Sequence, residues 1–165
     1  MRSQIQFLGS AHLFFELAWF DYPVKKQLGA PCKIYGIDTA FSILGWPPLS
    51  PDKVKTLENI VFIEIKRRGK EVFYFSGTKA CDFVIKDGRS ITGAIQVCNE
   101  LNEKNMGREC GGLLEAMESF HLELGLILTS DQEYTRKVGP RTVLIKPVWK
   151  LLLEDELHTL PSDGS

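Results

Sequence analysis

The sequence has little net charge, few cysteines and few histidines. Its 165 residues carry a formal net charge of −1, so no overall field draws the chain to DNA, RNA or an acidic membrane. The four cysteines form no C-x-x-C pair, which predicts reduced thiols and argues against structural zinc. The three histidines are isolated in sequence, which argues against a shared histidine metal site.

Long hydrophobic runs and nucleotide-binding motifs are missing too. The apolar stretch at residues 13–20 contains Glu16 and is too short to span a bilayer. The first residues lack the apolar run and cleavage site of a signal peptide, so we expect a cytoplasmic protein without a membrane partner. No G-x-x-x-x-G-K-[ST] motif occurs, so we expect no ATP site of the P-loop type in this chain.

The composition predicts one soluble globular protein with enough apolar residues for a hydrophobic core. Hydrophobic residues make up 44% of the chain and charged residues 25%, which is typical of globular domains. We predict a helix over residues 5–20 and a strand over residues 33–38. A break near residue 48 then divides the chain into a helical connector over 1–48, an α/β domain over 49–154 and a flexible tail over 155–165.

The clearest predicted helix covers residues 50–68. Ser50 can cap it, Pro51 suits its first turn and Gly69 can stop it. The further predicted elements are strands over 71–75, 82–85 and 91–98, a helix over 109–120, strands over 124–129 and 142–147, and a short helix over 149–153. This order predicts a mixed β-sheet flanked by helices.

Glu58 is predicted to lie in the middle of the apolar face of the helix over residues 50–68. Its neighbours on that face are Val54, Val61, Phe62 and Ile65. A carboxylate there is costly unless it is paired, protonated or bound to a metal. The helix alone leaves two explanations open, a structural carboxylate paired with arginine or backbone N–H groups, or a functional one.

Two polar residues on the predicted strands could join Glu58. Asp82 begins a strand, where its side chain is expected to point the same way as Val84, and Gln96 lies in the middle of another strand. Taken singly, Asp82 is more typical of a strand-end turn and Gln96 of a structural hydrogen bond. Taken together, Glu58, Asp82 and Gln96 are oxygen ligands of the kind that suits Mg²⁺ or Mn²⁺.

The order of these residues resembles the PD-(D/E)XK nuclease superfamily, with Gln96-Val97-Cys98 where that motif has E-x-K or Q-x-K. More closely, the chain resembles the C-terminal domain, of unknown function, of archaeal and bacterial AAA-type ATPases. The segments that carry this resemblance are residues 33–38, 57–69, 72–75, 82–85, 95–98, 126–129 and 147–152. The resemblance implies a restriction-endonuclease-like core, a metal site at Glu58, Asp82 and Gln96, and an ATPase half that this chain lacks.

The chain departs from the family pattern where catalysis is concerned. Cys98 stands in the lysine position, and a thiol cannot replace a fixed positive charge. Ala80 and Cys81 replace the Glu-Val that the family usually has before Asp-Phe. Lys79 or Lys86 could reach the site from a neighbouring strand, but nothing in the sequence shows it. We therefore expect a nuclease-like domain that is weak or inactive in cleavage.

The family resemblance also predicts partners for this chain. We expect an accessory or binding domain of an ATPase system, which contacts DNA or a P-loop ATPase chain and is a fragment or remnant of a longer protein. Lys66, Arg67 and Arg68 are candidate phosphate contacts, although basic residues at a helix end more often complement its dipole.

Two alternative functions stay open. They are an active Mg²⁺- or Mn²⁺-dependent DNA endonuclease with a displaced lysine, and a structural interaction domain. The interaction domain would dock through the aromatic side chains Phe14, Phe15, Trp19 and Phe20.

Overall fold

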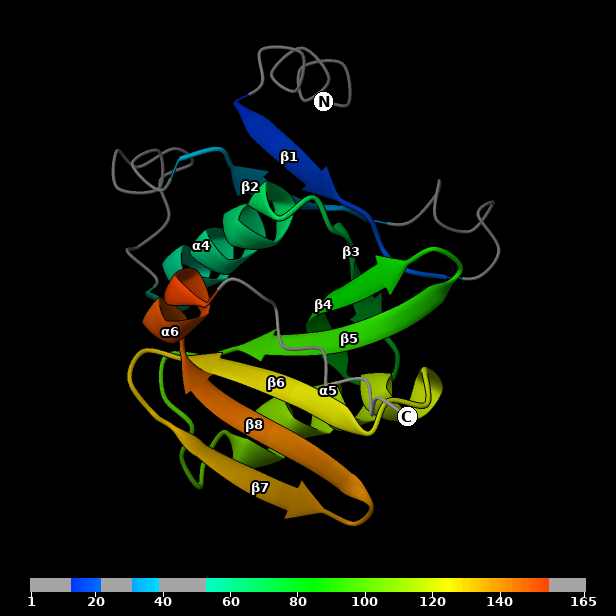
Figure 1. The fold of residues 1–165 in the computed structure, drawn as a ribbon, viewed down its shortest axis with the longest axis vertical. Coiled ribbons are helices and arrows are strands. Elements are labelled where there is room, and N and C mark those ends of the chain that lie inside the picture. The colour runs from blue at the N-terminus through cyan, green and yellow to red at the C-terminus, as the bar shows by residue number, and fades with distance from the viewer. Residues whose placement is uncertain (1–12, 22–30, 39–52, 155–165) are drawn as a thin grey trace.

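The computed structural model describes residues 13–21, 31–38 and 53–154. Six strands form one mixed sheet in the order β3-β4-β5-β6-β8-β7, with helices on both of its faces (Figure 1). The strands of the sheet are β3 (Glu71–Ser76), β4 (Ala80–Asp87), β5 (Ser90–Val97), β6 (Leu124–Thr129), β7 (Tyr134–Val138) and β8 (Arg141–Pro147). The helices are α4 (Lys53–Arg67), α5 (Met106–Ser119) and α6 (Val148–Leu153). The predicted α/β class with a mixed sheet flanked by helices is confirmed.

Tight turns join the antiparallel strands of the sheet, and a longer crossover joins parallel ones. β3, β4 and β5 form an antiparallel meander, and Gly88 supplies the positive φ of the tight β4–β5 turn. β5 and β6 are parallel and therefore need a crossover, which α5 provides. The order of helix, three strands, helix and strand agrees with the sequence. Strand β7 was not predicted, because its side chains are largely exposed and show no apolar alternation.

Two apolar cores cover the two faces of the sheet. Side chains of α4 and α6, such as Phe62 and Leu151, pack on one face against β5 and β6. Leu113 and Met117 of α5 pack on the other face. Successive residues of β8, such as Val143 and Leu144, enter opposite cores, as the period of two requires. The site described below lies on the α4 face.

The predicted N-terminal helix is wrong over the residues that are described. Residues 13–20 include a strand, β1 (Phe14–Leu17), which pairs antiparallel with β2 (Lys33–Gly36). Leu17 is buried while Glu16 is exposed, which is the alternation expected of a strand. The apolar residues of this segment therefore do not form one stripe of a helix. The soft boundary near residue 48 and the helix cap at Ser50 lie outside the described residues.

None of the four N-terminal aromatic side chains is exposed, so the prediction that they form an exposed surface is wrong. Phe15 contacts Phe62 of α4, with ring centroids 5.7 Å apart. Phe20 is only 8% exposed and meets Phe73 edge-on. The backbone of residues 18–20 bonds to Tyr74, which covers part of the free edge of β3. The exposed large apolar side chains of the described residues are Ile34 in β2, Ile37 just after it, Tyr134 on β7, and Trp149, Leu152 and Leu153 on α6.

Candidate functional site

A bulge in β4 decides where Asp82 points. Phe73 pairs with Val84 and Phe75 pairs with Cys81, so β4 has one more residue than β3 over this stretch. Val84 enters the core under α5, whereas the carboxylate of Asp82 turns toward α4. The prediction that Asp82 and Val84 share a face is therefore wrong, because the bulge interrupts the alternation.

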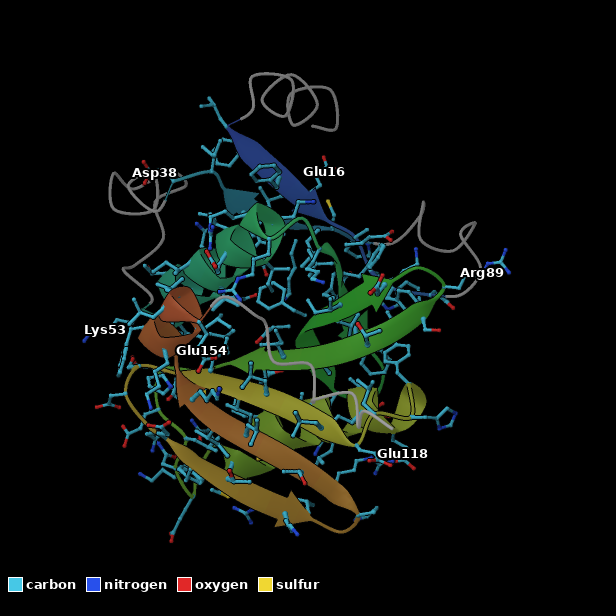
Figure 2. All side chains as sticks on the ribbon, viewed as in Figure 1. Glu16, Asp38, Lys53, Arg89, Glu118 and Glu154 are labelled. Atoms are coloured by element: carbon cyan, nitrogen blue, oxygen red, sulfur yellow. The ribbon has the colours of Figure 1, made fainter. Side chains whose placement is uncertain are left out.

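An ammonium group joins Glu58 and Asp82. Lys33 of β2 donates to Oε1 of Glu58 at 2.8 Å and to Oδ1 of Asp82 at 2.9 Å. The two carboxylate side chains are 15% and 14% exposed, and that of Lys33 is 33% exposed. The backbone N–H of Val97 donates to the other Asp82 oxygen at 3.0 Å. Figure 2 shows side chains filling the layer between α4 and the sheet.

Strand β2 is fixed to α4 by two further residues close to this cluster. The hydroxyl of Tyr35 donates to Oε1 of Glu58, and its ring stacks on Phe62 with centroids 4.3 Å apart. Gly36 exchanges two hydrogen bonds with the amide of Asn59, at 2.9 and 3.1 Å. These contacts hold β2 against α4, so the backbone that carries the Lys33 ammonium is fixed in position.

The pKa shifts in this cluster follow from two carboxylates that share one ammonium. Burial alone would lower the pKa of Lys33, but the negative charges of Asp82 and Glu58 outweigh burial and raise this pKa above its usual 10.5. Burial and the neighbouring Glu58 raise the pKa of Asp82, because one ammonium cannot fully offset two carboxylates. Burial, with the negative charge of Glu58, raises the pKa of the Tyr35 hydroxyl.

These shifts predict a loss of stability at alkaline pH. Lys33 and Tyr35 both have folded-state pKa values above their usual 10.5 and 10.0, so the unfolded chain releases these protons first. Above about pH 10 the folded state binds more protons than the unfolded state, and the free energy of unfolding falls as the pH rises. Urea unfolding near neutral pH and above about pH 10.5 will measure this fall. Tyr35→Phe should lessen it, and an unchanged pH slope in that variant would contradict the assignment.

The third predicted ligand, Gln96, is turned to the other face of the sheet. Its amide nitrogen donates to Oε2 of Glu109 on α5 at 2.8 Å, and its amide oxygen accepts the backbone N–H of Asp82 at 3.2 Å. Cys98 shares that face, as predicted, and is buried in the core under α5. Burial raises the pKa of the Cys98 thiol to about 12, so the thiol is neutral at physiological pH. The structure thus joins Glu58 and Asp82 and separates their side chains from Gln96 and Cys98.

The predicted metal ligands are hydrogen-bonded to other groups of the protein. The described residues contain no group of three or more His, Cys, Asp or Glu side chains that could hold a metal ion. The two carboxylates share an ammonium, and the Gln96 oxygen already accepts a backbone bond. Mg²⁺ prefers near-octahedral oxygen coordination, and here Oε1 of Glu58, both carboxylate oxygens of Asp82 and the Gln96 oxygen already accept hydrogen bonds.

Lys33 is the site residue that the sequence analysis missed. It lies 25 residues before Glu58, in a segment that we predicted only as a strand. The two lysines that we considered are engaged elsewhere: Lys79 donates to the carbonyl of Gly107 at 3.1 Å, and Lys86 to Glu71 at 2.8 Å. No local signal could have identified Lys33, since only the pairing of β2 with β1 and its packing on α4 bring it to the carboxylates.

The basic end of α4 is largely structural. The Arg68 side chain is 8% exposed and donates to Glu64 at 2.6 Å and to the carbonyl oxygens of Leu151 and Glu154 at 2.5 and 2.7 Å. Arg68 therefore fixes α6 and is not placed for a phosphate. Arg67 is 66% exposed but pairs with Glu64, and Lys66 is exposed. Of the three candidate phosphate contacts, Lys66 and Arg67 remain at the surface.

A polar hollow of about 240 Å³ is lined by residues of α4, of α5 and of the segment between β5 and α5. It lies where β5 ends and α5 begins, and it is also lined by Val54 of α4, one helical turn before Glu58. Arg108 and Glu109 both line the hollow and pair with each other, so its wall carries both signs of charge. Cys98 also lines the hollow.

Fold and site together define an α/β protein with a carboxylate pair held by lysine. The chain is similar to an uncharacterized protein of Methanocaldococcus jannaschii, with 32% identity over 160 residues and 88% of this chain covered. It spans about a third, 34%, of that protein's length. No protein-family model matches the chain. No solved structure matches it either. Among the described helices, none has the length and apolar character needed to cross a bilayer.

Proposed function

We propose that this chain is a nuclease-like domain that binds rather than cleaves, as an accessory module of an ATPase system. Two features support the nuclease-like assignment. The elements α4, β3, β4, β5, α5 and β6 follow one another in the order expected from the sequence motifs. Glu58 and Asp82, from the first helix and the second of the three strands, come within reach of one cation.

The orientation of the last motif supports the loss of cleavage. Gln96 and Cys98 face α5, and the position that would carry the nuclease lysine is a buried neutral thiol. Loss of one such electrostatic stabiliser lowers the rate of a reaction by about 10²–10³. This orientation is the single observation on which the proposal depends.

The binding half of the proposal needs a surface for a partner. The exposed face of α6 presents Trp149, Leu152 and Leu153, which are 51%, 42% and 77% exposed. Exposed apolar side chains grouped in this way are typical of protein contacts. The relative from M. jannaschii is about three times as long as the matched segment, which agrees with a domain that works beside other domains. A P-loop ATPase chain and DNA are the partners that we propose.

A second candidate is an active metal-dependent DNA endonuclease in which Lys33 is the displaced lysine. One observation favours it, the 2.9 Å contact between the Lys33 ammonium and Asp82. In such an enzyme a lysine beside the metal would stabilise the developing negative charge. The two candidates differ in what the protein does to DNA when Mg²⁺ or Mn²⁺ is supplied.

We expect no metal-dependent DNA cleavage above that of Asp82→Ala. The assay incubates the purified chain with linear, nicked and branched DNA and with Mg²⁺ or Mn²⁺, and resolves the products on denaturing gels. Fluorescence anisotropy on the same DNAs measures binding, which we expect to be independent of the metal. Cleavage that disappears in both Asp82→Ala and Lys33→Met would overturn the proposal and establish the second candidate.

A further inference from the structure

The ammonium of Lys33 takes the place that a metal would need. It donates to both carboxylates at hydrogen-bond distance and also lies 5.8 Å from the centre of the Tyr74 ring, so anionic and aromatic groups surround it. We infer that Lys33 is a built-in counterion that keeps the Glu58–Asp82 pair free of divalent metal. This inference rests on the proposed function only in supposing that a metal would otherwise bind there.

The position of the ammonium is set by backbone pairing as well as by its own charge. Lys33 pairs with Leu17 in the β1–β2 ribbon, and Leu17 is 1% exposed in the core. On the same strand, Tyr35 stacks on Phe62 and Gly36 bonds to Asn59. A lysine on a free loop would lose more side-chain entropy in forming the two bonds than one fixed by its strand.

A divalent ion would have to displace this ammonium. Four titratable groups meet here from three elements: Lys33 and Tyr35 from β2, Glu58 from α4 and Asp82 from β4. With Lys33 protonated and Tyr35 neutral, the cluster carries one net negative charge. A divalent ion entering beside Lys33 meets a like charge, and a displaced Lys33 would leave two strong hydrogen bonds unmade. Replacing Lys33 by a neutral side chain gives the cluster two net negative charges. It also removes the repelling charge and the two hydrogen bonds that a metal would have to break.

The test compares Mn²⁺ binding by the wild-type chain and by Lys33→Met. Isothermal titration calorimetry and Mn²⁺ electron paramagnetic resonance report binding without any assay of activity. We expect Lys33→Met to bind Mn²⁺ at least about tenfold more tightly than the wild type, since a unit charge a few ångströms away is removed. Adding Asp82→Asn to that variant should abolish the gain. Lys79→Met is the matched control, because the Lys79 ammonium donates to a backbone carbonyl away from the cluster and its loss should leave Mn²⁺ binding unchanged.

A measurement on the wild type keeps the inference testable if Lys33→Met does not fold. The amide of Val97 donates to Asp82, so Mn²⁺ at the carboxylate pair would broaden its NMR signal. We expect no selective broadening of Val97 in the wild type. Selective broadening that is lost in Asp82→Asn would overturn the inference, as would equal Mn²⁺ affinity in the wild type and Lys33→Met. A failure to bind DNA would contradict the proposed function alone and leave the Mn²⁺ result standing.

Discussion

Replacing Lys33 by methionine is expected to lower the free energy of unfolding by about 2–3 kcal/mol. Removing one partner of a buried ion pair typically costs about 3–5 kcal/mol, because the remaining charge stays buried without compensation. The expected loss here is smaller, since the Lys33 side chain is 33% exposed and water screens part of the interaction. Urea unfolding at neutral pH, followed by circular dichroism, measures the change.

A second lysine gives the control for this prediction. Lys79→Met removes the same charge from an exposed ammonium that donates to the carbonyl of Gly107, so its effect should stay within about 0.5 kcal/mol. If Lys33→Met and Lys79→Met lowered stability equally, the Lys33 contacts would contribute nothing specific. If Asp82→Asn in the Lys33→Met background restored stability, the loss would be assigned to the uncompensated carboxylate.

Gly112→Ala is expected to have the largest effect on the fold, with a loss of about 3 kcal/mol or more. A Cβ at Gly112 would overlap the carbonyl oxygen of Ala80 and lie 2.9 Å from its carbonyl carbon. Backbone atoms of a strand cannot move aside as a flexible side chain can, so α5 would have to shift away from β4. Because Ala80 and Cys81 begin the strand that carries Asp82, this shift should also disturb the carboxylate site.

The same helix contains a matched control. At Gly107, an added Cβ would meet no atom within 4 Å apart from those of its chain neighbours and the nearby backbone of its own helix. Gly107→Ala should therefore be neutral or stabilising by up to about 1 kcal/mol, as is usual for alanine in a helix. Thermal unfolding of the two variants compares the same chemical change at two positions of α5. Equal stability of Gly112→Ala and Gly107→Ala would contradict the close approach of α5 to β4.

Local patterns of the sequence were sufficient for the central part of the fold. The helix before Gly69 and the turn at Gly88 have strong end signals, and both glycines adopt positive φ as a helix stop and a tight turn require. The helix phase also placed Glu58 on the face that packs against the sheet. Strand β7 escaped prediction because an exposed edge strand has no buried face to give it an apolar alternation.

The candidate site was predictable only in part, because two of its determinants are not local. The bulge in β4 redirects Asp82, and it is defined by the pairing with β3 rather than by the residues of β4. Lys33 reaches Glu58 and Asp82 through packing between segments far apart in the chain. The sequence therefore identified the two carboxylates correctly as neighbours, but it could identify neither the direction of Gln96 nor the cation between them.

A crystal structure of the wild-type chain grown with Mn²⁺, with anomalous data collected for manganese, tests the central claim most directly. We expect the Lys33 ammonium between Glu58 and Asp82, within hydrogen-bond distance of both, and no anomalous peak at that position. A manganese peak bridging the two carboxylates, with Lys33 turned away, would contradict it.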